Sequence, residues 1–121
     1  MKLKSIEIDK RFVPEWNKNK DLPADEQVVI YFQRIPATSE ISNYKSFSVG
    51  ADSSLKLNYN DNTLAAAFIS KIDNLEINDK KIKNGKDLAT ASHPQLSNLF
   101  TEIRDYLFPD NEEFTEGEFE A

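Results

Sequence analysis

Apolar and polar positions alternate along several stretches of the chain, with the two-residue period of a half-buried β-strand. Residues 2–9 alternate imperfectly, which is typical of an edge strand. From Val28 to Phe32 apolar residues occupy both faces, which predicts a central strand or a strand covered on both sides. Residues 55–59 read Leu-Lys-Leu-Asn-Tyr, which predicts a strand with one apolar and one polar face.

Three other stretches carry apolar residues at helical spacing. Thr38 is placed as an N-cap for a short helix over 38–47, with Ile41, Tyr44 and either Lys45 or Phe47 as candidates for its inner face. A run of three alanines favours a helix over 63–71, capped by the polar residues 60–62. The last predicted helix, 93–108, opens with Ser92 and Gln95 at capping-box spacing. One face of this helix gathers Leu96, Leu99, Phe100, Ile103 and Leu107.

Together these elements predict an α+β fold with a small, mostly antiparallel sheet and two or three helices. We expect the sheet to contain Leu3–Ile8, Val28–Phe32 and Leu55–Tyr59, with a small hairpin over 75–83 that turns at Asn78-Asp79. The length of 121 residues suits one domain, which we place at residues 1–108. Residues 109–121, named here the acidic tail, lie outside that domain.

The segment from Phe12 to Gln27 contains the only Trp and two of the five Pro of the chain. It is rich in turn formers and is predicted to be an ordered loop. Trp16 has two interpretations: a plug on the core with Phe12 and Leu22 beside it, or an exposed anchor for a protein partner.

The net charge of −6 resides in the acidic tail. Six of the 21 acidic residues lie there without a Lys or Arg, which leaves 15 acids against 15 bases in residues 1–108. Because residues 1–108 carry no net charge, we predict no direct binding to nucleic acid. The lysines between 80 and 86 are interpreted as a solvated hairpin tip, because Asp79 and Asp87 flank them. The tail is either disordered or bound to a partner through Phe114 and Phe119.

Candidate chemistry is sparse in the sequence. There is no Cys, which excludes disulfides and thiolate chemistry, and three Gly leave no phosphate-binding loop of known pattern. His93, the only histidine, adjoins Pro94 at a helix start and is interpreted as a partly exposed structural residue. We therefore expect no catalytic residues, no cofactor and no metal. The chain also shows no apolar segment of membrane-spanning length and no signal-peptide pattern, which favours the cytoplasm.

Residues 12–27 read FVPEWNKNKDLPADEQ and resemble an FVPEWNGN.ELP..EQ opening found in small proteins from the structural modules of tailed bacteriophages. Residues 35–40, IPATSE, resemble the PT.EE that starts the first helix of those proteins. Residues 72–82, IDNLEINDKKI, resemble their I.NL.vnGk.I segment. Lys18 and Asp79 stand where the pattern has Gly, in two turns.

The resemblance implies a non-enzymatic role in phage morphogenesis, acting by protein–protein binding in the virion as an auxiliary capsid, head–tail or tail component. The partners would be other phage structural proteins, and the chain would be oligomeric or lattice-bound, in the host cytoplasm during assembly and then in the virion. Two alternatives remain open: a tail assembly chaperone absent from the mature particle, and a small inhibitory protein with a DNA-mimicking acidic tail. The predicted partner-binding residues are Phe12, Trp16, Leu22, Tyr31, Phe114 and Phe119.

Overall fold

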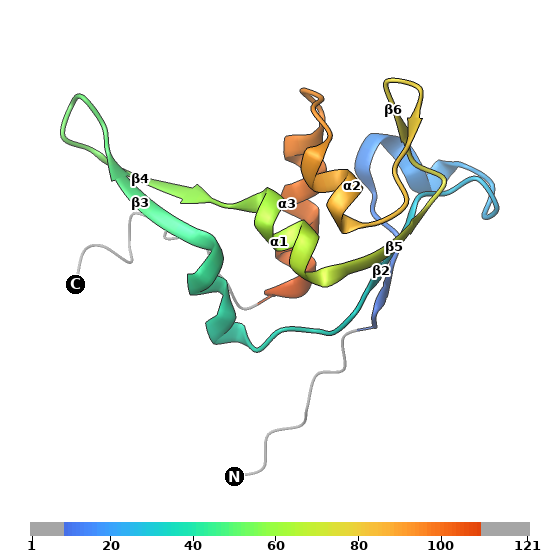
Figure 1. Cartoon of the computed structure of the whole chain (residues 1–121), viewed down its shortest axis with the longest axis horizontal. Coiled ribbons are helices and arrows are strands. Elements are labelled where there is room, and N and C mark those ends of the chain that lie inside the picture. The colour runs from blue at the N-terminus through green and yellow to red at the C-terminus, as the bar shows by residue number, and fades with distance from the viewer. Residues whose placement is uncertain (1–8, 110–121) are drawn as a thin grey trace, which may run out of the picture.

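The computed structural model describes residues 9–109 and confirms an α+β fold with small antiparallel sheets (Figure 1). The strands are β1 (Arg11–Phe12), β2 (Val29–Phe32), β3 (Lys45–Val49), β4 (Leu55–Tyr59), β5 (Ile69–Asp73), β6 (Glu76–Ile77) and β7 (Lys80–Lys81). The helices are the 3-10 helices η1 (Trp16–Asp21) and η2 (Thr38–Tyr44), and the α-helices α1 (Asp61–Phe68), α2 (Gly85–Thr90) and α3 (Leu96–Leu107).

The central sheet has the order β1-β2-β5, with both pairs antiparallel. The prediction of a central strand at 28–32 is confirmed, because Ile30 is fully buried and β2 has a neighbour on each side. The predicted sheet partners were wrong in part. Leu55–Tyr59 is a strand, but it pairs with β3 in a separate hairpin, and β5 takes the expected place beside β2. The predicted strand Leu3–Ile8 lies outside the described residues.

The helix predicted over 63–71 is present, but both its first and its last residue lie earlier in the chain than predicted. It is α1, whose N-cap Asn60 accepts a hydrogen bond from the backbone N–H of Thr63. The helix ends at Phe68 because Ile69 has extended backbone dihedrals and starts β5, where its β-branched side chain fits the pleat.

Helix α2 was not predicted, because its six residues are too few to show a periodic pattern. Its N-cap Asn84 accepts a hydrogen bond from the Asp87 N–H, 2.9 Å away. Helices α1 and α2 approach closely at Gly85. A Cβ atom at this position would lie 2.1 Å from the carbonyl oxygen of Ala65, so the contact requires glycine.

The predicted apolar face of the last helix is confirmed, since all five of its residues are buried in α3. The predicted capping box was wrong. The helix begins after Gln95, whose side chain does not cap it, and the Gln95 N–H donates instead to Nδ1 of His93 at 3.1 Å. This arrangement places His93 at the surface, in a single turn that precedes the helix.

The segment predicted as a helix over 38–47 divides into two elements. Helix η2 covers Thr38–Tyr44 and buries Ile41, whereas Phe47 belongs to strand β3 and is 54% exposed. The placement of Phe47 on an inner helical face was therefore wrong. The N-cap is Ala37 and not Thr38, and the Ala37 N–H donates to the Glu40 carboxylate at 2.6 Å.

The loop predicted over 12–27 is ordered, although its first residue belongs to β1. The side chain of Asn19 is 3% exposed and holds the loop closed. Its amide nitrogen donates to the carbonyl oxygens of Pro14 and Val28, and its Oδ1 accepts from the Val28 N–H at 2.7 Å. The loop turns at Asn17 and Lys18, which both have left-handed backbone dihedrals.

Candidate functional site

Phe12, predicted to bind a partner, lies in an intramolecular aromatic stack. Its ring centroid is 4.3 Å from that of Tyr106 in α3 and 6.3 Å from that of Phe32 in β2. The Tyr106 hydroxyl also donates to the Asp9 carbonyl at 2.6 Å, so α3 and the start of the described chain meet here. The stack accounts for the aromatic side chain of Phe12 without a partner.

Trp16 is partly buried and packs against the core. Its indole Nε1–H donates to the Gln95 carbonyl at 2.9 Å, and its backbone N–H donates to the Glu102 carboxylate at 3.2 Å. The residue therefore ties η1 to α3, which corresponds to the plug interpretation. Leu22 is not part of this plug, because its side chain is 44% exposed.

Tyr31 is partly buried in β2, with the Lys71 ammonium 5.2 Å from its ring centroid. Phe114 and Phe119 lie outside the described residues. Of the six predicted residues, the structure thus brings Phe12 and Trp16 onto α3, and it leaves Leu22 exposed on the loop.

The largest exposed apolar side chains of the described part of the chain gather mainly on the β3–β4 hairpin. Phe47, Val49 and Leu55 are 54%, 70% and 69% exposed. The register pairs Phe47 with Leu57 and Val49 with Leu55. Paired residues of an antiparallel ladder share one face, so these four side chains form a continuous surface, named here the hairpin face.

The hairpin extends away from the helices, at the end of the molecule opposite the β6–β7 hairpin (Figure 1). Its other face is polar and carries Ser46, Ser48, Lys56 and Asn58. The Asn58 side chain donates to the Ser48 hydroxyl at 2.8 Å across the strands. The two faces of the hairpin therefore differ sharply in polarity.

The sequence contains a signal for the hairpin face. Residues 46–49 and 55–59 both alternate polar and apolar residues, on either side of a turn-forming segment around Gly50. That symmetry is typical of a β-hairpin. It was hidden by the helical interpretation of 38–47, which placed Phe47 on the wrong kind of element.

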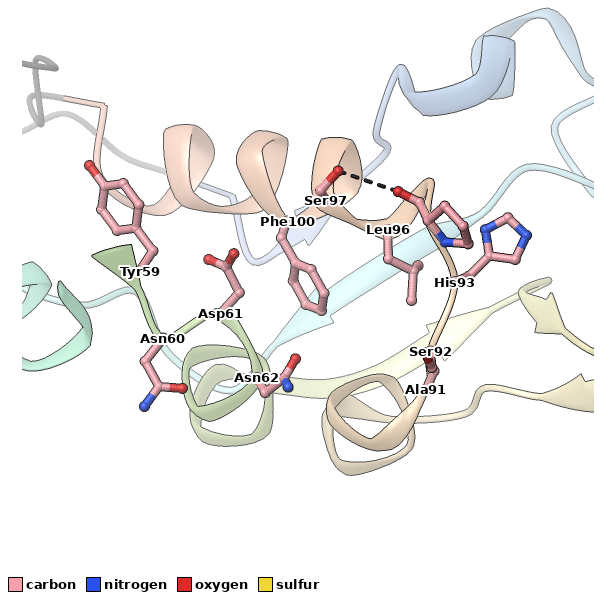
Figure 2. Close-up of a pocket in the computed structure, with 11 residues that line it drawn as sticks. Tyr59, Asn60, Asp61, Asn62, Ala91, Ser92, His93, Leu96, Ser97 and Phe100 are labelled. Carbon is pink, nitrogen blue, oxygen red and sulfur yellow. Dashed lines mark hydrogen bonds between the residues drawn. The ribbon is translucent and has the colours of Figure 1, made fainter. Parts of the chain in front are cut away.

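A cavity of about 400 Å³ lies between the start of α1 and the segment that joins α2 to α3 (Figure 2). Its polar lining includes Asp61, Ser92, His93 and Ser97. Among the described residues no hydrogen bond links His93 to a hydroxyl or to Asp61; its Nδ1 accepts from the Gln95 N–H. The Ser97 hydroxyl donates to the Pro94 carbonyl at 3.4 Å (Figure 2). The cavity thus lacks a nucleophile in contact with a base.

Asp61 is held by the most buried ion pair of the described chain. Its Oδ1 lies 2.8 Å from Nε of Arg104, and neither atom bonds to another group. The Arg104 guanidinium also lies 3.7 Å from the ring centroid of Tyr59, the last residue of β4. Burial raises the pKa of Asp61, and the Arg104 charge opposes that shift. This cluster fixes the root of the hairpin against α3.

Within residues 9–109 no three His, Asp or Glu side chains are grouped to hold a metal ion. None of the helices described there has the length and apolarity needed to cross a lipid bilayer. Comparisons with protein-family models, curated proteins and solved structures found no match.

Proposed function

We propose that the chain is a non-enzymatic structural or morphogenesis protein of a tailed bacteriophage, which acts in the virion by binding other phage structural proteins. The resemblance of residues 12–27, 35–40 and 72–82 to proteins of phage structural modules suggests the class. The observation that supports action by protein–protein binding is the hairpin face, an exposed apolar surface on a hairpin that extends beyond the core.

Two physical arguments support binding through this hairpin. An isolated two-stranded hairpin is marginally stable in water, so packing its apolar face on a partner stabilises it. Contiguous exposed apolar surface on a monomer is commonly an interaction site. In addition, β3 and β4 pair only with each other in the described part of the chain, so each has an outer edge open to a further strand.

The experiment is a gene replacement in the genome that encodes the chain. The variant V49T/L55T removes apolar surface while threonine retains a high strand propensity. The matched control S46A/K56A changes the polar face of the same hairpin. The measurements are the yield of infectious particles and the presence of the chain in purified particles by mass spectrometry.

We expect the chain in the particles, a large loss of yield for V49T/L55T and a normal yield for the control. A normal yield for V49T/L55T would contradict binding through the hairpin face. A loss of yield with the chain absent from purified particles would contradict a virion component and would favour the assembly chaperone.

A further inference from the structure

We propose that Asn84 is a site of spontaneous deamidation and that the docking of α2 on α1 controls the reaction. Residues 84 and 85 form the only Asn-Gly pair of the chain. Glycine has no side chain to hinder attack by its own nitrogen, so an unfolded chain loses ammonia most readily at such a pair. The hairpin face takes no part, so the site is independent of the proposed function.

The reaction forms a five-membered imide from the two residues. The main-chain nitrogen of Gly85 attacks Cγ of Asn84, and a new C–N bond forms. The C–NH₂ bond of the side chain breaks, and ammonia leaves with the proton of the Gly85 N–H. Water then opens the imide at one of its two carbonyls. One opening gives aspartate, and the other gives isoaspartate, whose main chain runs through the former side chain.

The start of α2 holds Asn84 in a conformation that opposes ring closure. Asn84 is the N-cap, and its Oδ1 accepts from the Asp87 N–H at 2.9 Å. The Asp87 carboxylate in turn accepts from the Lys83 N–H at 3.1 Å. A planar imide needs the Asn84 Cβ and the Gly85 nitrogen eclipsed about the Cα–C bond, whereas the ψ of 179° at Asn84 keeps them staggered. Ring closure therefore requires rotation of Gly85 relative to Asn84.

The neighbours of Asn84 on both sides are fixed by tertiary contacts. Gly85 is buried, and a Cβ built on it would lie 2.1 Å from the carbonyl oxygen of Ala65, so its backbone is in close contact with α1. The Lys83 carbonyl accepts from the Ile72 N–H of β5 at 2.8 Å. Gly85 can rotate only when α2 leaves α1, so the reaction depends on this local opening.

The two products have opposite effects on the fold. Aspartate keeps a side-chain oxygen at the N-cap and caps a helix as well as asparagine does. Isoaspartate adds one carbon to the main chain between Lys83 and Gly85, which β5 and α1 hold at a fixed separation. Isoaspartate at position 84 therefore prevents α2 from docking again. Because the conversion is irreversible, molecules that have opened are removed from the folded population.

The first test compares the deamidation rate of the full chain in mildly alkaline buffer with and without denaturing urea. Peptide mapping by mass spectrometry follows each asparagine, and an isoaspartate-specific methyltransferase distinguishes the two products. We expect Asn84 to convert at least about ten-fold more slowly in the folded chain, because only the open form reacts. Asn98, exposed in α3 and followed by leucine, is the internal reference and should convert slowly in both. Equal rates at Asn84 would overturn the proposal.

A pair of variants tests the role of α2. Leu88→Ala removes a fully buried side chain of α2, and Lys86→Ala is the matched control at an exposed position of the same helix. In buffer, Leu88→Ala is expected to convert Asn84 several-fold faster than the natural chain, whereas Lys86→Ala should not; in urea all three should agree. A Leu88→Ala chain that fails to fold should convert in buffer as fast as in urea. Equal rates for the two variants in buffer would overturn the proposal.

The last test concerns the product. Ion-exchange chromatography separates the isoaspartate form of the chain, and Asn84→Asp supplies the matched carboxylate without the added main-chain carbon. We expect Asn84→Asp to melt near the natural chain and the isoaspartate form to melt well below it. An isoaspartate form that melts together with Asn84→Asp would contradict the irreversible opening of α2.

Discussion

Single polar side chains hold the loop of residues 12–27 in place. Asn19 is almost fully buried, and its three hydrogen bonds satisfy backbone groups that face away from water. A buried backbone group without a partner is costly, so the amide of Asn19 substitutes for the strand or helix partners that a loop lacks. The loop is therefore ordered although its regular structure is limited to β1 and short 3-10 turns.

Replacement of Asn19 by alanine is expected to lower the free energy of unfolding by about 2–4 kcal/mol, because it leaves the backbone groups of Pro14 and Val28 unpaired. Urea denaturation followed by Trp16 fluorescence measures this loss. The control is Asn98→Ala, at an exposed position of α3, which should change stability little. A loss below about 1 kcal/mol would show that water replaces the amide.

Backbone conformation at Lys18 leads to a second prediction. Its φ of 59° lies in the left-handed region, which costs a residue with a Cβ roughly 1 kcal/mol relative to glycine. Lys18→Gly should therefore raise the melting temperature, despite the greater entropy of the unfolded chain. Lys20→Gly, at a position without a left-handed dihedral, should lower it. Calorimetry compares the two, and an equal effect of both variants would contradict the argument.

Among the secondary-structure elements, the positions of the helices depend on close packing of one helix on another and on hydrogen bonds at the helix ends. The contact of α1 with α2 depends on the missing side chain of Gly85. Helix η2 is held at its start by Glu40, which accepts from the Ala37 N–H and forms a two-pronged pair with Arg34 at 2.8 and 2.9 Å. The Gly85 contact and the Glu40 hydrogen bonds each join neighbouring parts of the fold through only one or two residues.

Gly85→Ala is expected to destabilise the fold by about 3 kcal/mol, because the new methyl group would overlap backbone atoms that cannot move independently. Thermal unfolding followed by circular dichroism measures the effect. The matched control is Gly50→Ala, where the nearest atom to a new Cβ is a carboxylate oxygen of the exposed Asp52 side chain, at 2.9 Å, and not a backbone atom. Similar melting temperatures for the two variants would contradict the close packing of α1 on α2.

The Glu40 pair predicts a pH dependence. The hydrogen bonds from Arg34 and from the Ala37 N–H hold the pKa of Glu40 below its ordinary value of 4.5. The folded state thus favours the carboxylate, and this stabilisation is present above pH 4.5 and is lost as the pH falls through the lowered pKa. Glu40→Gln should therefore melt below the natural chain at neutral pH, and the difference should vanish in acid. A difference independent of pH would indicate lost packing instead of lost charge.

For the whole molecule, the hairpin face and the core are separate apolar surfaces. The core gathers the central sheet and helices α1 to α3, whereas the hairpin extends beyond it (Figure 1). Residues that are exposed in the monomer contribute little to its stability. Substitutions in the hairpin face are therefore expected to affect function, whereas substitutions in the core are expected to affect folding.

V49T/L55T should alter the free energy of unfolding by less than about 1 kcal/mol, because both side chains are more than two-thirds exposed. Ile103→Ala, in the buried face of α3, should cost about 2–5 kcal/mol. Chemical denaturation of both variants measures the contrast. A large loss of stability in V49T/L55T would show that the hairpin face is part of the folding core and would weaken its proposed role in binding.

Local sequence patterns were enough to predict the α+β class, the strand at 28–32, the apolar face of α3 and the β6–β7 turn. This turn lies at Asn78 and Asp79, which both have left-handed dihedrals. These features depend on neighbours in the chain, through periodicity and turn chemistry. Three features could be seen only in the folded molecule: the partners of β2, the division of 38–47 into a helix and a strand, and the buried position of Asn19. Each of these depends on groups distant in sequence, as when the polar amide of Asn19 finds its partners in the backbone of Pro14 and Val28.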